Sequence, residues 1–188
     1  MTMPTETRVI VLAVGIAAGT YMLGMLLWSI ARPEQRVWPP EQATAAIKFR
    51  VWFMTILIFA ATFFLGLLDR NSLGWPASIR RGIGLPLILI GNIIVWRGVR
   101  KIGMAATSGE ASGLKTDGLC RWSRNPQYVA DMAILIGWSV LAASLWTLPV
   151  LGIGLAVLLV APFAEEPWLE DRYEGAYRSY KSTVRRFL

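Results

Sequence analysis

The sequence predicts an all-α membrane protein with about five transmembrane helices. Hydrophobic residues make up 55% of the 188-residue chain and charged residues only 16%, whereas a soluble domain averages about 45–50% and about 25%. The apolar residues are gathered into long runs, and about 20 such residues in a helix cross a bilayer. We therefore expect a polytopic protein with one helical domain, in which the last two spans form a hairpin followed by an amphipathic helix.

Three apolar runs are expected to cross the membrane in the first half of the chain. Residues 9–31 are uncharged and follow a single basic residue, Arg8. Because the apolar part of a signal peptide has about 7–15 residues, this longer run is interpreted as a first transmembrane helix. Residues 51–68 and 82–99 are the next two predicted spans, and the proline-rich segment 32–46 is predicted to be an interfacial loop.

The second half begins with a long polar loop, residues 100–125. Pro126 suits the first turn of a helix, where its missing N–H is no loss, so a fourth span is predicted from there to about residue 146. An uncharged link leads to a fifth run, residues 150–163, which indicates a tight helical hairpin. The tail, residues 165–188, has an apolar and aromatic stripe at helical spacing and is predicted to be an amphipathic cytoplasmic helix on the membrane surface. The stripe consists of Leu169, Tyr173, Tyr177, Tyr180, Val184 and Phe187.

The distribution of basic residues predicts the orientation in the bilayer. With five spans, fifteen of the nineteen Lys and Arg residues fall on one side and four on the other. Because basic loops stay cytoplasmic, the N-terminus is expected outside and the C-terminus in the cytoplasm. The net charge of +7 is then explained by orientation and by anionic lipid headgroups, and no nucleic-acid partner is expected.

The residue inventory restricts the chemistry. The chain has no histidine, which removes the commonest general base and the commonest zinc ligand, so no metal is expected. The single cysteine, Cys120, excludes an internal disulfide. A general base must therefore come from a carboxylate, a tyrosine or a lysine, or the substrate must react without one.

Two polar blocks are predicted to meet on the cytoplasmic side. The first is residues 114–128, which carry basic residues, aromatic residues and two turn signals. The second begins at Glu165 and Glu166, directly after the last apolar run. Adjacent carboxylates near hydrocarbon are costly and usually have a partner, which a cation would supply. Asp131, one turn into the fourth span, is a further functional candidate because intramembrane acids rarely lack a role.

The order of these motifs resembles the C-terminal signature of the integral-membrane methyltransferases, which include isoprenylcysteine carboxyl methyltransferase and the phospholipid N-methyltransferases, and specifically their bacterial members. The signature is a glycine and arginine before R-(H/N)-P-x-Y, an apolar hairpin, E-E-x-x-L, Y-x-x-Y and V-x-R-F, and the resemblance covers residues 103–188. The matching residues are Gly118, Arg121, Arg124, Asn125, Pro126, Tyr128, Glu165, Glu166, Leu169, Tyr177, Tyr180, Val184, Arg186 and Phe187.

Four positions depart from the family pattern. Asn125 replaces the common histidine, Ala130 stands where a glycine is usual, and Arg185 stands where a proline is usual. In the tail, Glu174 follows Tyr173 where the family has glycine, and the chain's glycine is displaced by one residue.

The resemblance implies methyl transfer from S-adenosylmethionine at the cytoplasmic face of a bacterial inner membrane. The implied acceptor is lipophilic or membrane-associated: a phospholipid amine, a prenylcysteine-like carboxyl group or a hydrophobic thiol. Residues 82–188 would bind the cofactor, while residues 8–81 would shape the entry of the acceptor among the membrane lipids.

Two alternatives stay open: an NADPH-dependent reductase of the related sterol reductase type, and a small transporter or scaffold. A transporter would show related halves or paired broken helices, and neither is visible.

The implied site residues divide by role. Arginines are suited to bind the cofactor's carboxylate, and Glu165 or Glu166 could bind its amine. Aromatic faces could lie beside its sulfonium, and the backbone of the loop could bind its adenine. The expected cofactor contacts are Leu114, Gly118, Leu119, Arg121, Arg124, Asn125, Pro126, Tyr128, Glu165, Glu166, Tyr177 and Arg186. An amine acceptor must also lose a proton, and the candidate catalytic bases are Glu165, Glu166 and Asp131.

Overall fold

The computed structural model describes residues 4–41, 44–102 and 113–188. The expected all-α class is confirmed, since these residues form five α-helices and two short 3-10 helices and no strand. The elements are α1 (Thr5–Ala31), η1 (Pro33–Gln35), α2 (Ala45–Leu68), α3 (Ala77–Ile102), η2 (Gly118–Arg121), α5 (Pro126–Ala142) and α6 (Thr147–Thr183).

The described helices include four that are long and apolar enough to cross a bilayer: α1, α2, α3 and α6. The fifth, α5, has 17 residues, which is about 26 Å at 1.5 Å per residue and short of a hydrocarbon core of about 30 Å. The chain is thus a polytopic membrane protein, and α5 begins at Pro126 as predicted.

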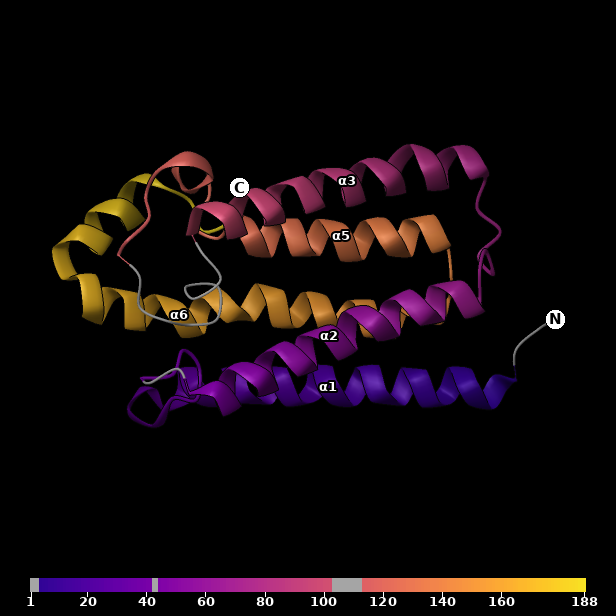
Figure 1. Ribbon diagram of the computed structural model, residues 1–188, viewed down its shortest axis with the longest axis horizontal. Coiled ribbons are helices and arrows are strands. Elements are labelled where there is room, and N and C mark those ends of the chain that lie inside the picture. Colours follow the sequence, from indigo (N-terminus) through magenta and orange to yellow (C-terminus); the bar gives the residue numbers. More distant parts are fainter. Residues whose placement is uncertain (1–3, 42–43, 103–112) are drawn as a thin grey trace.

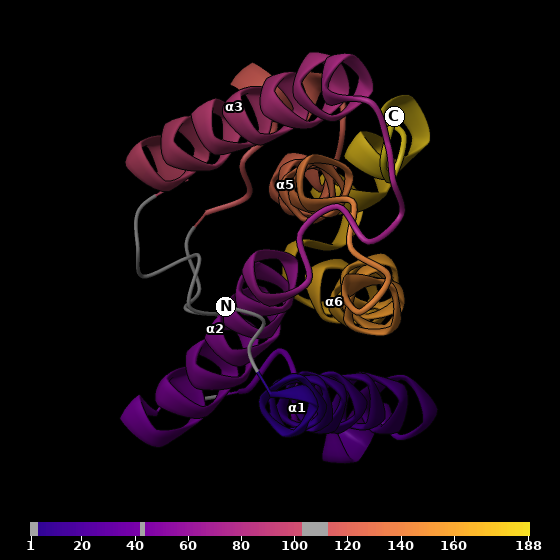
Figure 2. The same ribbon diagram turned by 90° about the vertical axis from the view of Figure 1, so that its right-hand side faces the viewer.

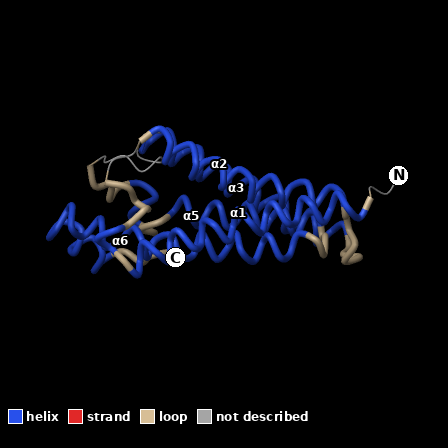
Figure 3. The backbone as a smooth tube through the Cα atoms, turned by 90° about the horizontal axis from the view of Figure 1, so that it is seen from below, coloured by secondary structure: helices blue, strands red, loops and turns tan. Residues whose placement is uncertain are grey.

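All five helices run lengthwise, so the connecting segments gather at two ends of the bundle (Figure 1, Figure 3). One end, the site end, holds residues 32–41 and 113–125 together with the C-terminal tail. The other, the hairpin end, holds the N-terminus and the short links before α3 and α6. Seen along the bundle, α5 and α6 lie between α3 on one side and the pair α1–α2 on the other (Figure 2).

Glycines allow α3 and α5 to pack with their backbones in close contact. A Cβ added at Gly84 would lie 2.8 Å from the carbonyl oxygen of Gly137, and one added at Gly91 would lie 2.8 Å from that of Ala130. Small residues bring membrane helices together in this way, because dispersion contacts replace the missing hydrophobic driving force. The core on the other side of α6 is built from α1, α2 and α6 around Leu26, Leu65 and Val150.

The hairpin end is fixed by Asp69, which follows α2. Its carboxylate accepts hydrogen bonds from Ser72 (2.6 Å) and Ser144 (2.9 Å) and pairs with Arg8 at 3.3 Å. Burial alone would raise the pKa of Asp69, but the hydrogen bonds from Ser72 and Ser144 outweigh it and hold that pKa below its ordinary value. One ionised carboxylate therefore ties α1, the α2–α3 link and the α5–α6 link together.

The predicted tail helix is a continuation of α6. At 37 residues, or about 55 Å, α6 extends well past the bilayer core, and its helical geometry is interrupted at Glu174 (φ 45°, ψ −122°). Beyond this kink the chain turns back over residues 113–125 (Figure 1). Two residues of the predicted stripe, Tyr177 and Tyr180, are buried there in a cluster with Cys120.

Glu174 has a backbone conformation that side chains with a Cβ rarely adopt and that glycine adopts freely. This is also where the family pattern has glycine. We expect Glu174→Gly to raise the free energy of unfolding by about 1 kcal/mol, measured as a shift in Tm of the detergent-purified protein. Ala176→Gly is the control, because a glycine in regular helix should lower stability by about 0.5–1 kcal/mol. Equal destabilisation by both variants would contradict the assignment of strain to Glu174.

Candidate active site

Three charged residues join the two polar blocks at the site end, and we call Arg124, Glu166 and Arg186 the arginine clasp. Arg186 donates to Glu166 through Nε (2.8 Å) and Nη2 (2.7 Å), and Arg124 donates through Nη2 at 2.7 Å. Arg124 also donates Nη1 to the carbonyl oxygens of Lys181 (3.0 Å) and Val184 (2.7 Å). The cationic partner expected beside the paired carboxylates is therefore present for Glu166.

The Glu166 carboxylate of the arginine clasp is ionised at neutral pH despite its burial. Burial would raise the pKa of Glu166, but hydrogen bonds from Arg186 and then Arg124 outweigh it and hold that pKa below its ordinary value. The same hydrogen bonds to Glu166 raise the pKa of Arg186. Such charge-assisted, bidentate contacts are the strongest hydrogen bonds that side chains form.

The last residues of the chain run beside residues 123–125. The Arg124 N–H donates to the carbonyl of Arg185 (2.9 Å), and the Asn125 side chain donates to that of Arg186 (3.0 Å). Asn125 occupies the N-cap position of α5, but its side chain makes no capping hydrogen bond. Its side chain thus fastens the tail to the loop.

Aromatic residues complete the contact between loop and tail. The Tyr180 hydroxyl donates to the carbonyl of Cys120 at 2.6 Å, and Leu114 packs against the same cluster. Tyr177 is almost fully buried, and burial, with the nearby Glu166 charge, raises its pKa to about 12. Tyr177 therefore stays neutral and contributes its ring to the apolar packing between the tail and the loop.

Glu165 faces a different side of α6 from its neighbour, because adjacent helical residues are about 100° apart. It accepts hydrogen bonds from the Trp38 indole N–H (2.8 Å) and from the Tyr128 hydroxyl. Trp38 lies in the link between α1 and α2 and is buried. Among the residues that the structure describes, no cation pairs with Glu165.

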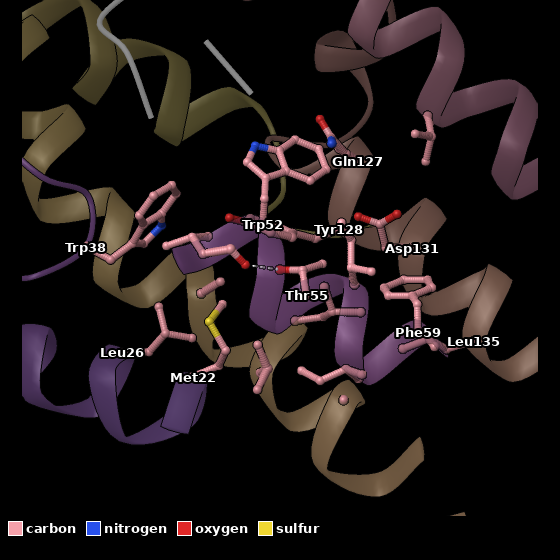
Figure 4. Close-up of a pocket in the computed structure, with 18 of the residues that line it drawn as sticks. Met22, Leu26, Trp38, Trp52, Thr55, Phe59, Gln127, Tyr128, Asp131 and Leu135 are labelled. Carbon is pink, nitrogen blue, oxygen red and sulfur yellow. Dashed lines mark hydrogen bonds between the residues drawn. The ribbon is translucent and has the colours of Figure 1, made fainter. Parts of the chain in front are cut away.

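An apolar cavity of about 430 Å³ lies between the helices beside this network (Figure 4). Its polar lining residues are Lys48, Thr55, Gln127, Tyr128 and Asp131. Its apolar lining includes Met22, Leu26, Val51, Trp52, Ile56, Ile58, Phe59, Val95, Trp96, Val99, Leu135, Gly154, Val157, Leu158 and Ala161. No described residue donates a hydrogen bond to Asp131, which projects among Tyr128 and Phe59 in Figure 4.

A second hollow, the loop pocket, has a volume of about 470 Å³ and lies between the end of α3 and the loop that leads into α5. It is lined by Ile94, Arg97, Gly98, Lys115, Asp117, Gly118, Leu119, Cys120, Trp122, Pro126 and Gln127. Gly118 has a φ of 61°, where a side chain would introduce strain. Gln127 lines both the loop pocket and the apolar cavity, so the two hollows adjoin.

A third hollow, the outer groove, runs along α6 and has a volume of about 600 Å³. It is lined by Phe163, Glu166, Pro167, Glu170, Asp171, Glu174, Arg178 and Lys181. Four acidic and two basic side chains line it, and the two basic ones, Arg178 and Lys181, both pair with Glu170. The lining therefore carries more negative than positive charge.

The residues expected to form the site fall into neighbouring groups. Gly118, Leu119 and Pro126 line the loop pocket. Tyr128 and Asp131 line the apolar cavity, and Glu165 lies behind Tyr128. Arg121 is exposed and has no partner within the described parts of the chain.

Several residues of these hollows were not predicted as site residues from the sequence, among them Trp38, Arg97, Lys115, Asp117 and Gln127. Gln127 is the variable position of the R-N-P-x-Y motif. Arg97 was interpreted only as a basic residue near the end of a span, and Lys115 as a basic residue of the first polar block without a role of its own. Only Trp38 has a feature in the sequence that could have indicated a role in the site: it is a tryptophan among prolines in a loop between two apolar runs.

Comparison with known proteins gives one match. A family model described as phospholipid methyltransferase matches residues 79–176, just over half of the chain. The matched segment runs from α3 into the kinked part of α6 and so includes the loop pocket, Asp131 and both carboxylates. No curated protein and no solved structure was found to match.

The arginine clasp predicts a large difference between two nearby arginines. Arg124→Ala leaves the buried Glu166 short of a charge partner and should cost about 3–5 kcal/mol of stability, measured by thermal unfolding of the purified protein. Arg121→Ala, the matched control, removes an exposed side chain and should change stability by less than about 0.5 kcal/mol. Similar Tm values for both variants would mean that the clasp does not hold the loop.

Proposed function

The chain belongs to the phospholipid methyltransferase family, and we propose that it transfers a methyl group from S-adenosylmethionine to a lipophilic acceptor held within the membrane. The family gives the methyltransferase activity and a membrane lipid-like substrate. The observation that supports the finer proposal is the pair of hollows that adjoin at Gln127, one beside the loop with charged residues in its lining, the other apolar and within the bundle.

The loop pocket has the groups that S-adenosylmethionine requires. Arg97 and Lys115 suit the cofactor's carboxylate, and Asp117 suits its amine. The exposed ring of Trp122 offers a face for adenine or for the sulfonium. The volume lies within the range of about 300–1,000 Å³ that is usual for ligand pockets. When bound, S-adenosylmethionine supplies a methyl group on a positively charged sulfur.

The arginine clasp is proposed to support cofactor binding by holding the loop in place. Arg124, Glu166 and Arg186 are engaged with one another, so a direct contact with the cofactor would require them to exchange partners. Asn125 and Tyr177 have the same supporting role, since both join the tail to the loop. Arg121, which is exposed, is the arginine of the motif that stays available to a ligand.

Asp131 favours an amine among the three acceptor classes. A carboxylate facing an apolar cavity attracts a cation strongly, since little water competes for it, and it repels a carboxylate or a thiolate. Asp131 can take a proton from the ammonium group of the acceptor, which frees the nitrogen lone pair. With S-adenosylmethionine bound, this lone pair would attack the methyl carbon, and the electron pair of the broken sulfur–carbon bond would remain on sulfur.

The remaining groups position the reactants. Gln127 borders both hollows, so the acceptor nitrogen and the methyl group would meet beside its side chain, and proximity of about 3–3.5 Å supplies much of the rate. Glu165 holds the Tyr128 hydroxyl and the Trp38 indole from behind the cavity wall. Of the three candidate bases, Asp131 is therefore the best placed.

The site end is proposed to face the cytoplasm of a bacterial cell, with the N-terminus outside. Most basic residues lie in the segments at the site end, and such segments stay cytoplasmic. A water-soluble cofactor would then enter the loop pocket from the cytoplasm, and the acceptor would reach the apolar cavity from the bilayer.

Calorimetric titration with S-adenosylhomocysteine tests the cofactor. The purified wild-type protein should bind it in the micromolar range, and Lys115→Ala and Arg97→Ala should each bind at least about tenfold more weakly, because each removes a charge-assisted hydrogen bond. Arg178→Ala in the outer groove is the control and should bind as the wild type does. A folded wild-type protein that binds NADPH and not S-adenosylhomocysteine would overturn the proposal in favour of a reductase.

Methylation assays with a primary alkylamine test the role of Asp131. Asp131→Asn cannot take the proton, so kcat/KM near neutral pH should fall by about 10²–10⁴ and recover as the pH rises toward the pKa of the amine. Affinity for S-adenosylhomocysteine should not change. The control, Asp171→Asn, alters an exposed residue of α6 and should be fully active. An active Asp131→Asn enzyme, or one that accepts only thiols, would exclude this role.

A further inference from the structure

The apolar cavity extends inward from the site end by similar distances along two helices. On α5 its lining residues Gln127, Asp131 and Leu135 lie on successive turns, and eight residues of helix span about 12 Å. On α6 it extends from Ala161 to Gly154, which is about 10 Å. The cavity is therefore a slot that runs from the loop level to the middle of the bundle.

The inner end of the slot is closed at Gly154. A Cβ added there would lie 3.1 Å from Ile58 Cγ2 and 3.2 Å from Leu135 Cδ1. Ile58 and Leu135 are themselves buried, at 4% and 2% exposed. Three helices thus meet at this point, and the absence of a side chain on Gly154 sets the depth of the slot.

One side of the slot faces the surroundings of the bundle. Ile56 on α2 and Trp96 on α3 both line the cavity and are 57% and 58% exposed. In the described parts of the chain α3 packs on α5, and α2 packs on α1, α5 and α6, so α2 and α3 stand apart (Figure 2). A hydrocarbon chain can enter from the bilayer through this side.

The polar groups of the slot are concentrated near the site end. Gln127, Tyr128 and Asp131 lie in the first turns of α5, whereas the inner end is hydrocarbon (Figure 4). The one deeper hydroxyl, that of Thr55, is satisfied by the carbonyl of Val51 at 2.9 Å. An amphiphile would accordingly lie with its amine at Asp131 and its chain pointing toward Gly154.

We propose that the acceptor is a single-chain amphiphilic amine, and that the closed end at Gly154 limits the length of chain the slot holds. The proposal rests on the function proposed above and specifies its substrate class. The slot is about 12 Å deep in all, and about 6 Å of it lies beyond Asp131, which fits an extended chain of roughly five carbons. The volume of about 430 Å³ is that of a pocket for one small ligand, so at least one chain of a lipid with two long chains would stay outside it.

The test is a series of primary alkylamines, from four to sixteen carbons, with the protein in lipid nanodiscs. For each amine, kcat/KM and the calorimetric affinity are measured for the variant Gly154→Leu and for the wild type. The value of the variant is divided by that of the wild type, and this ratio does not depend on how strongly the amine partitions into the bilayer. The ratio should stay within about twofold for the four-carbon chain. It should fall by at least about tenfold for ten carbons and longer, since one misplaced methylene in an apolar pocket already costs that much.

Two further variants keep the test decisive. Gly152→Leu, on the same helix where an added side chain meets nothing within 4 Å, should leave the ratio near one at every chain length. Ile58→Ala enlarges the closed end and should raise the ratio of variant to wild type for the longer chains. This variant provides the test if Gly154→Leu does not fold.

The outcomes separate the two proposals. A ratio that does not depend on chain length in Gly154→Leu or Ile58→Ala would overturn the slot, as would faster methylation of a diacyl phosphatidylethanolamine than of every single-chain amine. Chain-length-dependent binding without methylation of any amine would leave the slot in place and reject the proposed function instead.

Discussion

The ion pairs of Glu166 with Arg124 and Arg186 are the interaction on which the site end depends. Three segments far apart in the sequence meet at this carboxylate: the loop before α5, the middle of α6 and the last residues of the chain. An ionised carboxylate is expensive to bury unless it is paired, so the loop and the tail must adopt this arrangement together. The loop pocket exists because the arginine clasp fixes the loop that lines it.

The two adjacent carboxylates therefore have different tasks. Glu166 is neutralised by two arginines, whereas Glu165 accepts hydrogen bonds from Trp38 and Tyr128. Glu165 thus links α6 to a tryptophan outside the segment that matches the family. Half of the apolar cavity is likewise lined by α1, α2 and the link between them. Under the proposed function, the N-terminal helices would accordingly determine which acceptor is bound, and the matched segment would supply the cofactor pocket.

Much of this architecture follows from local rules that can be applied to the sequence. The apolar runs predict the helices, and Pro126 marks the start of α5 because proline fits a first helical turn. The same rules predict that the loop and Glu166 meet at one end of the bundle. They do not reveal that Arg124 faces Glu166 and the tail carbonyls, because that depends on the fold of the chain after Glu174. Trp38 and Gln127 were not predicted, because their roles depend on contacts between helices. Neither the periodicity of apolar residues nor the spacing of motifs reveals such contacts.

We propose that methyl donor and acceptor occupy two hollows that meet at Gln127. The decisive measurement is an experimental structure of the protein with S-adenosylhomocysteine and a bound alkylamine. We expect the adenosine in the loop pocket, the sulfur beside Gln127 and the amine nitrogen between the sulfur and Asp131. Adenosylhomocysteine bound in the outer groove beside Glu166, or an amine whose nitrogen lies away from Asp131, would contradict it.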